Sequence, residues 1–241
     1  MSQKLIILFD FDGVIITQRS LEYSASIFLK RNFYKWKNTE NIRLIDLARF
    51  FEESDSKSKW TAFKQINRVY KHFIPSFWRR NIFFINFRRT YPKFEKYETL
   101  TPNLDRVLKE LKKKDIPLGI VSNTSSKRLE YFKRKLHLEK YFTVFISRDE
   151  SPVRKPNAYP IILALKELKK RITISIDKNT VYYIGDLPSD IECAKNAEIK
   201  SIALLSGHGK KEDMEKSNPT IILEDIKEIL EIEQFKKLLF K

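Results

Sequence analysis

Two aspartates follow a short apolar run near the start of the chain, in the segment LIILFDFDGVII. The run at residues 5–9 is long enough for a buried strand, and Asp10 and Asp12 come after it at alternate positions, with Gly13 behind them. Two carboxylates beside a buried strand are costly in free energy unless a positive group compensates them. The motif alone is also typical of a polar turn, so its meaning depends on the rest of the chain.

A second pair of acidic residues follows another apolar run, in YYIGDLPSDIECAKNA. Asp186 ends this run, and Asp190 comes four residues later, where a helix is expected to begin. Asp190 on its own is explained equally well as an acidic residue that favours a helix N-terminus. If both runs end at one edge of a sheet, the carboxylates converge, and a divalent cation would relieve their repulsion. Oxygen ligands without a neighbouring His or Cys favour Mg²⁺ over Zn²⁺.

Polar groups elsewhere in the chain are placed where they could bind an anion. Ser122 follows the apolar run at 118–121 and offers a hydroxyl and nearby backbone N–H groups, with Asn123 next to it. Lys155 stands directly before Pro156, ahead of the run that Asp186 ends. In so basic a chain a single lysine is most often a solvated side chain. Its place between the other motifs makes Lys155 a candidate for the site.

The elements that must position these residues follow from the apolar pattern. Helical spacing of apolar residues, as over 104–111 and 161–168, fills the gaps between short apolar runs. Strands that alternate with helices predict a doubly wound, Rossmann-like parallel α/β sheet. In such sheets ligands bind beyond the carboxyl ends of the strands, where Asp10, Ser122 and Asp186 fall. The expected strands, nearly continuous in apolar residues, are 5–9, 118–121, 181–184 and 202–205, with weaker ones at 143–146 and 220–223.

Residues 17–97 interrupt this alternation and predict an all-helical insert. The segment has no glycine and almost no strand pattern, and helices are expected at 20–31, 42–52, 59–73 and 77–89. It holds 18 of the 47 Lys and Arg residues but only 7 of the 31 Asp and Glu, so it carries most of the net charge of +16. The expected domains are an α/β core at 1–16 and 98–241 and a helical domain at 17–97.

The composition of the whole chain limits the class of protein. Of the 241 residues 42% are hydrophobic, and no apolar run approaches the roughly 20 residues that span a bilayer. The N-terminal pattern is not that of a signal peptide, and one cysteine, Cys193, fits a reducing cytosol. We therefore expect a soluble cytoplasmic protein. The high net charge favours anionic partners, and the abundance of Lys, Ile and Glu is a feature of thermophilic proteins.

The motifs DFDGV, VSNTS, RKP and GDLPSD, in this order, resemble the four motifs of the haloacid dehalogenase superfamily of phosphohydrolases. The resemblance runs over residues 5–197 and covers the expected core. A helical insert between the first and second motifs is similar to the C1 type of cap domain, as in the group of phosphoglycolate phosphatase and β-phosphoglucomutase. Val14, Thr17 and Glu198 depart from residues that are common at these positions in the family.

The resemblance also implies a mechanism and a role for each candidate residue. Asp10 would be the nucleophile that forms an aspartyl-phosphate. Asp12 would protonate the leaving oxygen and then draw a proton from the water that hydrolyses the intermediate. The implied ligands of Mg²⁺ are Asp10, the backbone carbonyl of Asp12 and Asp186, with Asp190 as a further ligand or as an anchor behind them. The residues implied to bind the phosphoryl oxygens are Ser122, Asn123 and Lys155.

The leading prediction is a Mg²⁺-dependent phosphatase of a small phosphorylated metabolite, active as a monomer or homodimer and without a membrane partner. A phosphomutase of the β-phosphoglucomutase type uses the same intermediate and stays open as an alternative. The basic insert leaves a further alternative open, a nucleic-acid binder or a phosphatase of nucleotides or nucleic-acid ends. Cys193 is predicted to be a buried residue without a catalytic role. His208, in SGHGK, is predicted to be a turn residue, with a contact to the substrate as the alternative.

Overall fold

The computed structural model describes residues 4–17, 76–172, 175–233 and 235–236, together with residues 20, 23, 26, 27, 31, 71 and 74. The chain divides into two units, Met1–Thr17 with Leu100–Lys241, and Gln18–Thr99. In the second unit the structure describes α4 (Phe77–Thr90), close to the expected helix at 77–89. The helices expected at 42–52 and 59–73, and most of the one at 20–31, lie outside the described residues. No helix in the described part of the chain has both the length and the apolar character needed to cross a membrane.

The described part of the first unit is built on a six-stranded parallel sheet with the strand order β3-β2-β1-β4-β5-β6. Each strand lies within two residues of the range expected from the apolar runs, so the prediction of a parallel α/β sheet is confirmed. The strands are β1 (Ile6–Phe9), β2 (Leu118–Val121), β3 (Val144–Ile146), β4 (Val181–Gly185), β5 (Lys200–Leu204) and β6 (Ile221–Leu223).

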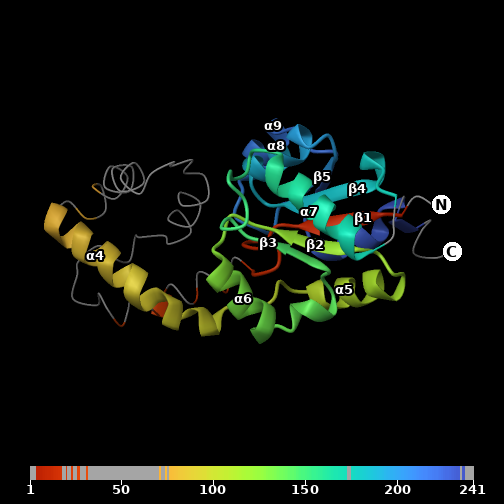
Figure 1. The fold of residues 1–241 in the computed structure, drawn as a ribbon. Coiled ribbons are helices and arrows are strands. Elements are labelled where there is room, and N and C mark those ends of the chain that lie inside the picture. The colour runs from red at the N-terminus through yellow and green to blue at the C-terminus, as the bar shows by residue number, and fades with distance from the viewer. Residues whose placement is uncertain are drawn as a thin grey trace. The chain divides into compact units, whose positions relative to one another are not determined.

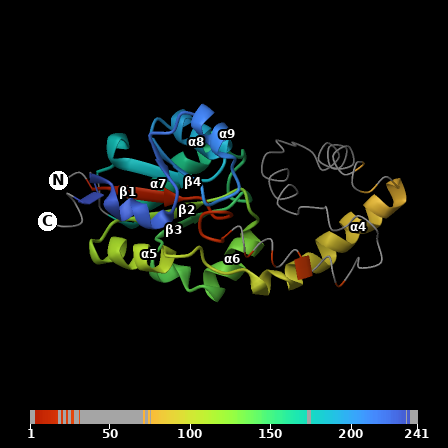
Figure 2. The same ribbon diagram turned by 180° about the vertical axis from the view of Figure 1, so that it is seen from behind.

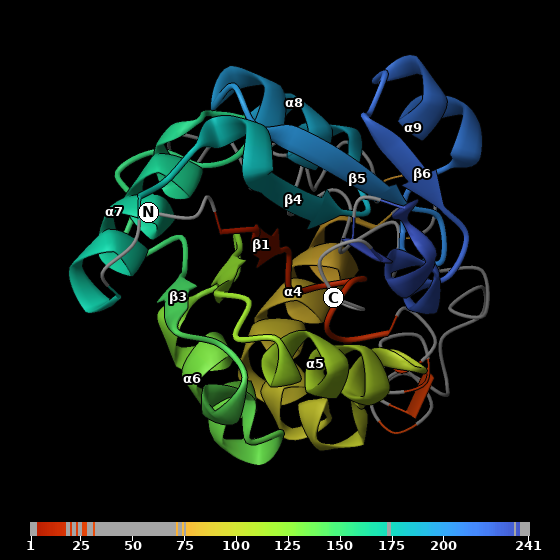
Figure 3. The same cartoon turned by 90° about the vertical axis from the view of Figure 1, so that its right-hand side faces the viewer.

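Helices cover both faces of this sheet (Figures 1 and 2). Figure 3, viewed at a right angle to Figure 1, shows the two helical layers on either side of the strands. The layered arrangement is the doubly wound architecture expected for strands that alternate with helices. One face carries α7 (Tyr159–Arg171) and α8 (Pro188–Asn196), the other carries α5 (Leu104–Lys113) and α6 (Ser126–Lys135), and α9 (Lys211–Lys216) follows β5.

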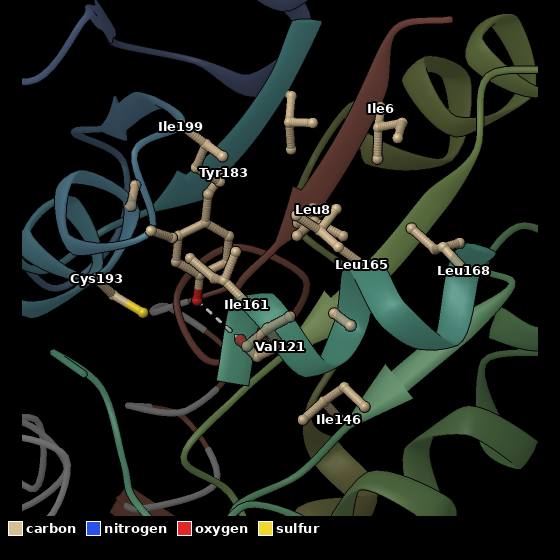
Figure 4. Close-up of a cluster of buried hydrophobic side chains, with 14 of the residues drawn as sticks. Ile6, Leu8, Val121, Ile146, Ile161, Leu165, Leu168, Tyr183, Cys193 and Ile199 are labelled. Atoms are coloured by element: carbon tan, nitrogen blue, oxygen red, sulfur yellow. Dashed lines mark hydrogen bonds between the residues drawn. The ribbon is translucent and has the colours of Figure 1, made fainter. Parts of the chain in front are cut away.

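The core between the sheet and α7 and α8 explains the sequence pattern of the strands (Figure 4). Ile6 and Leu8 of β1 both belong to this core because alternate residues of a strand face the same side. Tyr183 of β4 lies beside them, fully buried. Its hydroxyl donates a hydrogen bond of 2.8 Å to the backbone carbonyl of Val121, at the end of β2. A polar atom of the core thus lies at the carboxyl end of the sheet.

Backbone hydrogen bonds extend the ladder by one residue at this carboxyl edge. The N–H of Asp10 donates to the carbonyl of Ile184 at 2.8 Å, and the N–H of Ser122 donates to that of Ile146 at 2.9 Å. Because their backbones are held by a neighbouring strand, the side chains of Asp10 and Ser122 start from fixed positions.

Candidate active site

Three buried carboxylates gather where the two central strands end. Asp10 follows β1, Asp186 follows β4, and Asp190 lies in the first turn of α8. One carboxylate oxygen of each lies within 4.8 Å of the others, and all three residues are buried. β1 and β4 are hydrogen-bonded neighbours, so their ends bring Asp10 and Asp186 together. The structure therefore shows the convergence of acidic residues that the positions of the two motifs indicate.

Lys155 supplies the positive charge that the first motif requires. Its Nζ donates to Asp10 Oδ1 and to Asp190 Oδ1, each at 2.6 Å, and to the hydroxyl of Tyr183 at 3.0 Å. Only 4% of the lysine side chain is exposed. The backbone N–H of Lys155 donates to Asn123 Oδ1 at 3.2 Å. Asn123 thus holds the segment that carries the lysine.

Asp190 is anchored by the backbone at the start of α8. Its Oδ2 accepts the N–H groups of Asp186 and Leu187, at 3.1 and 3.0 Å. A negative charge is favourable at this end of a helix. The backbone approaches Asp190 so closely that a Cβ added at Gly185 would lie 2.1 Å from the Asp190 Cβ. Both oxygens of Asp190 are therefore engaged, one by Lys155 and the other by backbone donors.

The loop after β5 encloses Asp186, and His208 of this loop lies in the site. The His208 backbone N–H donates to Asp186 Oδ2 at 2.6 Å, and its Nδ1 lies 2.8 Å from the same oxygen. His208 is 1% exposed, so its prediction as a mere turn residue is wrong. A Cβ at Gly207 would lie 2.2 Å from the Asp186 Cβ. Glycines on both sides of His208 were the sequence signal that this loop approaches another group closely.

Burial determines the electrostatics of the carboxylates. Desolvation raises the pKa of Asp10 well above its ordinary value of 3.8, opposed by Lys155 and reinforced by Asp190 and Asp186. Desolvation is also the main reason why the pKa of Asp190 is raised. Asp186 Oδ1 is buried and has no hydrogen-bond partner among the described residues. Three clustered carboxylates, two of them paired with Lys155 and the third with one oxygen unpartnered, form a donor set that fits a divalent cation bound by oxygen ligands.

The Asp12 carboxylate lies outside this cluster and pairs with Arg128 of α6 instead. Arg128 Nη1 lies 2.6 and 2.7 Å from the two oxygens of Asp12. The turn after Asp12 requires glycine, because Gly13 has a φ of 82° and a Cβ there would lie 1.9 Å from Asp186 Oδ2. The sequence pattern did not single out Arg128, since one arginine in a basic helix has no distinguishing neighbours.

The remaining predicted residues lie at the same edge of the sheet or directly beneath it. Ser122 is 4% exposed, and its Oγ accepts the backbone N–H of Thr124 at 3.1 Å. Cys193 is buried, as predicted, and its Sγ lies 3.0 Å from the carbonyl oxygen of Asn157. Burial raises the pKa of the Cys193 thiol to about 12, which keeps it protonated near neutral pH.

Comparison with known proteins relates the chain to a family and to two named relatives. The family model described as haloacid dehalogenase-like hydrolase matches residues 7–204. The chain is 27% identical over 237 residues to a protein of Caldanaerobacter subterraneus that bears the name "Putative pyrophosphatase PpaX", over 94% of this chain and 93% of that protein. It is 29% identical over 131 residues to the phosphoglycolate phosphatase of Escherichia coli K12. That match covers 54% of this chain and 50% of the enzyme, so the chain spans about half of that relative's length.

A solved structure shares the fold over nearly the whole chain. It is a subfamily IA, variant 1 hydrolase of the haloacid dehalogenase superfamily from Geobacter sulfurreducens, with a TM-score of 0.68 and 18% identity. The comparison covers 95% of this chain and 96% of that one. Residues 7–204, which match the family model, include the three clustered carboxylates, Lys155 and Asp12. The chain belongs to the haloacid dehalogenase-like hydrolases.

Proposed function

We propose that the protein is a Mg²⁺-dependent phosphatase that hydrolyses a small phosphomonoester through phosphorylation of Asp10. The observation that carries the proposal is the buried group of Asp10, Asp186 and Asp190, with Lys155 bonded to two of its members. Membership of the hydrolase family and the likeness to a phosphoglycolate phosphatase support a phosphomonoester as the substrate.

In the first half-reaction the phosphoryl group passes to Asp10. A carboxylate oxygen of Asp10 attacks phosphorus in line, and the electron pair of the breaking bond stays on the leaving oxygen. Asp12 donates a proton to that oxygen. Lys155, which lies 2.6 Å from Asp10 Oδ1, stabilises the negative charge of the group in transfer.

In the second half-reaction water releases the phosphoryl group. Asp12, now ionised, takes a proton from the water as its oxygen attacks phosphorus, and the bond from phosphorus to Asp10 breaks. Inorganic phosphate leaves and both aspartates return to their starting protonation. The Ser122 hydroxyl and the backbone N–H groups that follow β2 bind phosphoryl oxygens during both steps.

Asp10, Asp186 and the backbone carbonyl of Asp12 are proposed to hold Mg²⁺. The bound ion would neutralise charge on the carboxylates and on the phosphoryl oxygens. The buried Asp186 Oδ1 lacks a hydrogen-bond partner among the described residues, so a bound cation would stabilise this oxygen most. Asp190 acts chiefly as an anchor, because Lys155 and backbone N–H groups already occupy its two oxygens.

The second unit, Gln18–Thr99, is proposed to be the helical cap that selects the substrate. The positive charge of the predicted insert, residues 17–97, suits a phosphorylated substrate. In α4, Arg79 is exposed, whereas Arg80 is buried and its Nη1 donates to the carbonyl of Ile74 at 2.6 Å. Arg79 is thus a better candidate than Arg80 for a contact with an anionic ligand.

Phosphate release from a panel of metabolite phosphomonoesters, measured with Mg²⁺ and with EDTA, tests the proposed function. We expect Mg²⁺-dependent release that Asp10→Asn abolishes without unfolding the protein. Asp213→Asn, at an exposed residue of α9, is the matched control and should keep wild-type turnover. Release from no member of the panel, or full turnover by Asp10→Asn, would contradict the proposal. Turnover that needs a sugar bisphosphate and yields an isomeric sugar phosphate would identify a mutase instead.

A further inference from the structure

A separate ion pair, between Asp12 and Arg128, lies apart from the clustered carboxylates. Both oxygens of Asp12 contact Arg128 Nη1, at 2.6 and 2.7 Å, and Nη1 also donates to Thr124 Oγ1 at 3.2 Å. The side chains of Arg128 and Asp12 are 16% and 11% exposed. Because water shields this ion pair little, it holds the two side chains in place more firmly than an ion pair on the surface would.

Aromatic rings fix the guanidinium of Arg128 from a second direction. Its Cζ lies 5.3 Å from the ring centroid of Phe11 and 5.0 Å from that of Phe132, within the range of cation–π contacts. Both rings are fully buried, and their centroids are 5.6 Å apart. Phe11 lies between Asp10 and Asp12 in the sequence. The turn that carries the two aspartates therefore also contributes an aromatic ring that contacts the Arg128 guanidinium.

Helix stability does not explain why an arginine stands at this position of α6. The Ser125 side chain accepts the backbone N–H of Arg128 at 3.3 Å, which places Arg128 in the first turn. That turn contains no acidic residue, and a cation there opposes the helix dipole. The contact with Asp12 compensates this unfavourable placement. The position of Arg128 is thus better explained by what it does to Asp12 than by helix formation.

We propose that Arg128 is a positioning residue that fixes the Asp12 carboxylate for proton transfer to the leaving group. The inference rests on the proposed function, in which Asp12 is the general acid. Because Nη1 contacts both oxygens, one oxygen keeps its hydrogen bond while the other carries the proton. As the bond from phosphorus to the leaving oxygen breaks, the Asp12 O–H bond breaks and its proton joins that oxygen. Arg128 keeps all its protons throughout.

This role makes the effect of Arg128 depend on the leaving group. Phenyl phosphate expels a basic phenolate, which needs a proton in the transition state, whereas 2,4-dinitrophenyl phosphate expels a weakly basic one that does not. The two substrates share the phosphoryl group and the ring. A residue that only stabilised the fold would lower both rates by the same factor.

The test is kcat/KM for both substrates, at saturating Mg²⁺, in wild-type protein and in variants of Arg128, because kcat/KM reports only the steps through loss of the leaving group. For Arg128→Gln we expect kcat/KM to fall by about 10- to 100-fold on phenyl phosphate and by no more than about threefold on 2,4-dinitrophenyl phosphate. Arg128→Lys, which keeps the charge, should recover part of the loss. Arg134→Gln is the matched control and should not change either rate, because Arg134 lies on the same helix, is 80% exposed and pairs with Glu130 at 2.8 Å.

The ratio of the two rates in one sample does not depend on the folded fraction, so a partly unfolded variant still decides the question. Equal losses on both substrates, or no loss in Arg128→Gln, would overturn the positioning role. Asp12→Asn separates this inference from the proposed function. If Asp12→Asn shows the dependence on the leaving group and Arg128→Gln does not, the inference fails alone. If Asp12→Asn shows none, or the wild type hydrolyses neither substrate, the proposed function fails as well.

Discussion

Lys155 lies between Asp10 and Asp190, 2.6 Å from an oxygen of each. At the scale of single residues, such shared contacts decide both stability and chemistry. A buried ion pair adds little net stability, but removing one member leaves a buried charge uncompensated. The charge of Lys155 is therefore expected to stabilise the folded protein when no cation is bound, and to stabilise the phosphoryl group during catalysis.

We predict that Lys155→Met lowers the free energy of unfolding by about 3–5 kcal/mol when no divalent cation is present, because it leaves the carboxylates unpaired. Urea unfolding in EDTA measures this loss. Lys170→Met is the control, since Lys170 is an exposed residue of α7 that pairs with Glu167 on the same helix. A loss in Lys155→Met no larger than in Lys170→Met would show that the carboxylates do not depend on this lysine.

His208 is expected to act on Mg²⁺ through Asp186, because its backbone N–H and its Nδ1 both lie within hydrogen-bond distance of Asp186 Oδ2 and leave Oδ1 for the ion. We predict that His208→Ala weakens Mg²⁺ binding by about 10- to 100-fold, the usual effect of losing a hydrogen bond to a metal ligand. Calorimetric titration with Mg²⁺ measures this affinity without substrate. His208→Asn should restore part of it, and His137→Ala, at a histidine whose side chain is 75% exposed, should leave it unchanged. Unchanged affinity in His208→Ala would remove His208 from the site.

At the scale of elements, the turns after the strands bring the chain close to the carboxylates. Gly13 has a φ of 82°, and a Cβ added there would lie only 1.9 Å from Asp186 Oδ2. We predict that Gly13→Ala abolishes Mg²⁺ binding and lowers the free energy of unfolding by more than about 1 kcal/mol. The comparison variant is Gly119→Ala in β2, whose Cβ would come closest to the flexible Leu8 side chain, at 2.8 Å. Gly119→Ala should lose stability but still bind Mg²⁺. Normal Mg²⁺ binding by Gly13→Ala, or loss of binding in Gly119→Ala, would contradict this prediction.

The elements were largely predictable from sequence, whereas some of their contacts were not. Strands such as β1 and β4 are buried on both faces, so their apolar runs are unambiguous, and the acidic residues that end them mark the site directly. Arg128 and His208 reach the aspartates from a helix and a loop distant in sequence. Such contacts depend on how the elements pack, and neither residue stands in a pattern of its own. Of these two contacts, only that of His208 had a local signal in the sequence, the flanking glycines that indicate a close approach to another group.

At the scale of the whole molecule, the buried carboxylates link stability to pH. The pKa of Asp10 is raised above its ordinary value of 3.8, so the folded protein holds this proton over a range in which the unfolded chain has lost it. The resulting stability is fully present below the ordinary pKa and is lost as the pH rises through the raised one. The pKa of Asp190 is raised as well and contributes with the same sign.

We therefore predict that Asp10→Asn makes the stability of the cation-free protein less dependent on pH. Above the ordinary pKa, its free energy of unfolding should fall less steeply than that of the wild type, by up to about 1.4 kcal/mol per pH unit. Urea unfolding in EDTA over a series of pH values measures the difference, with Asp213→Asn as the control. Parallel curves for wild type and Asp10→Asn would show that burial does not hold the Asp10 proton.

The residue that is phosphorylated during turnover can be identified directly, and it decides whether Asp10 is the nucleophile. The protein is mixed with 2,4-dinitrophenyl phosphate and Mg²⁺, quenched with acid within one turnover, and digested for mass spectrometry. We expect one acid-stable, base-labile phosphoryl group on Asp10, absent when EDTA replaces Mg²⁺ and absent in Asp10→Asn. A phosphoryl group on another residue, or rapid product release by Asp10→Asn at the wild-type rate, would contradict this assignment.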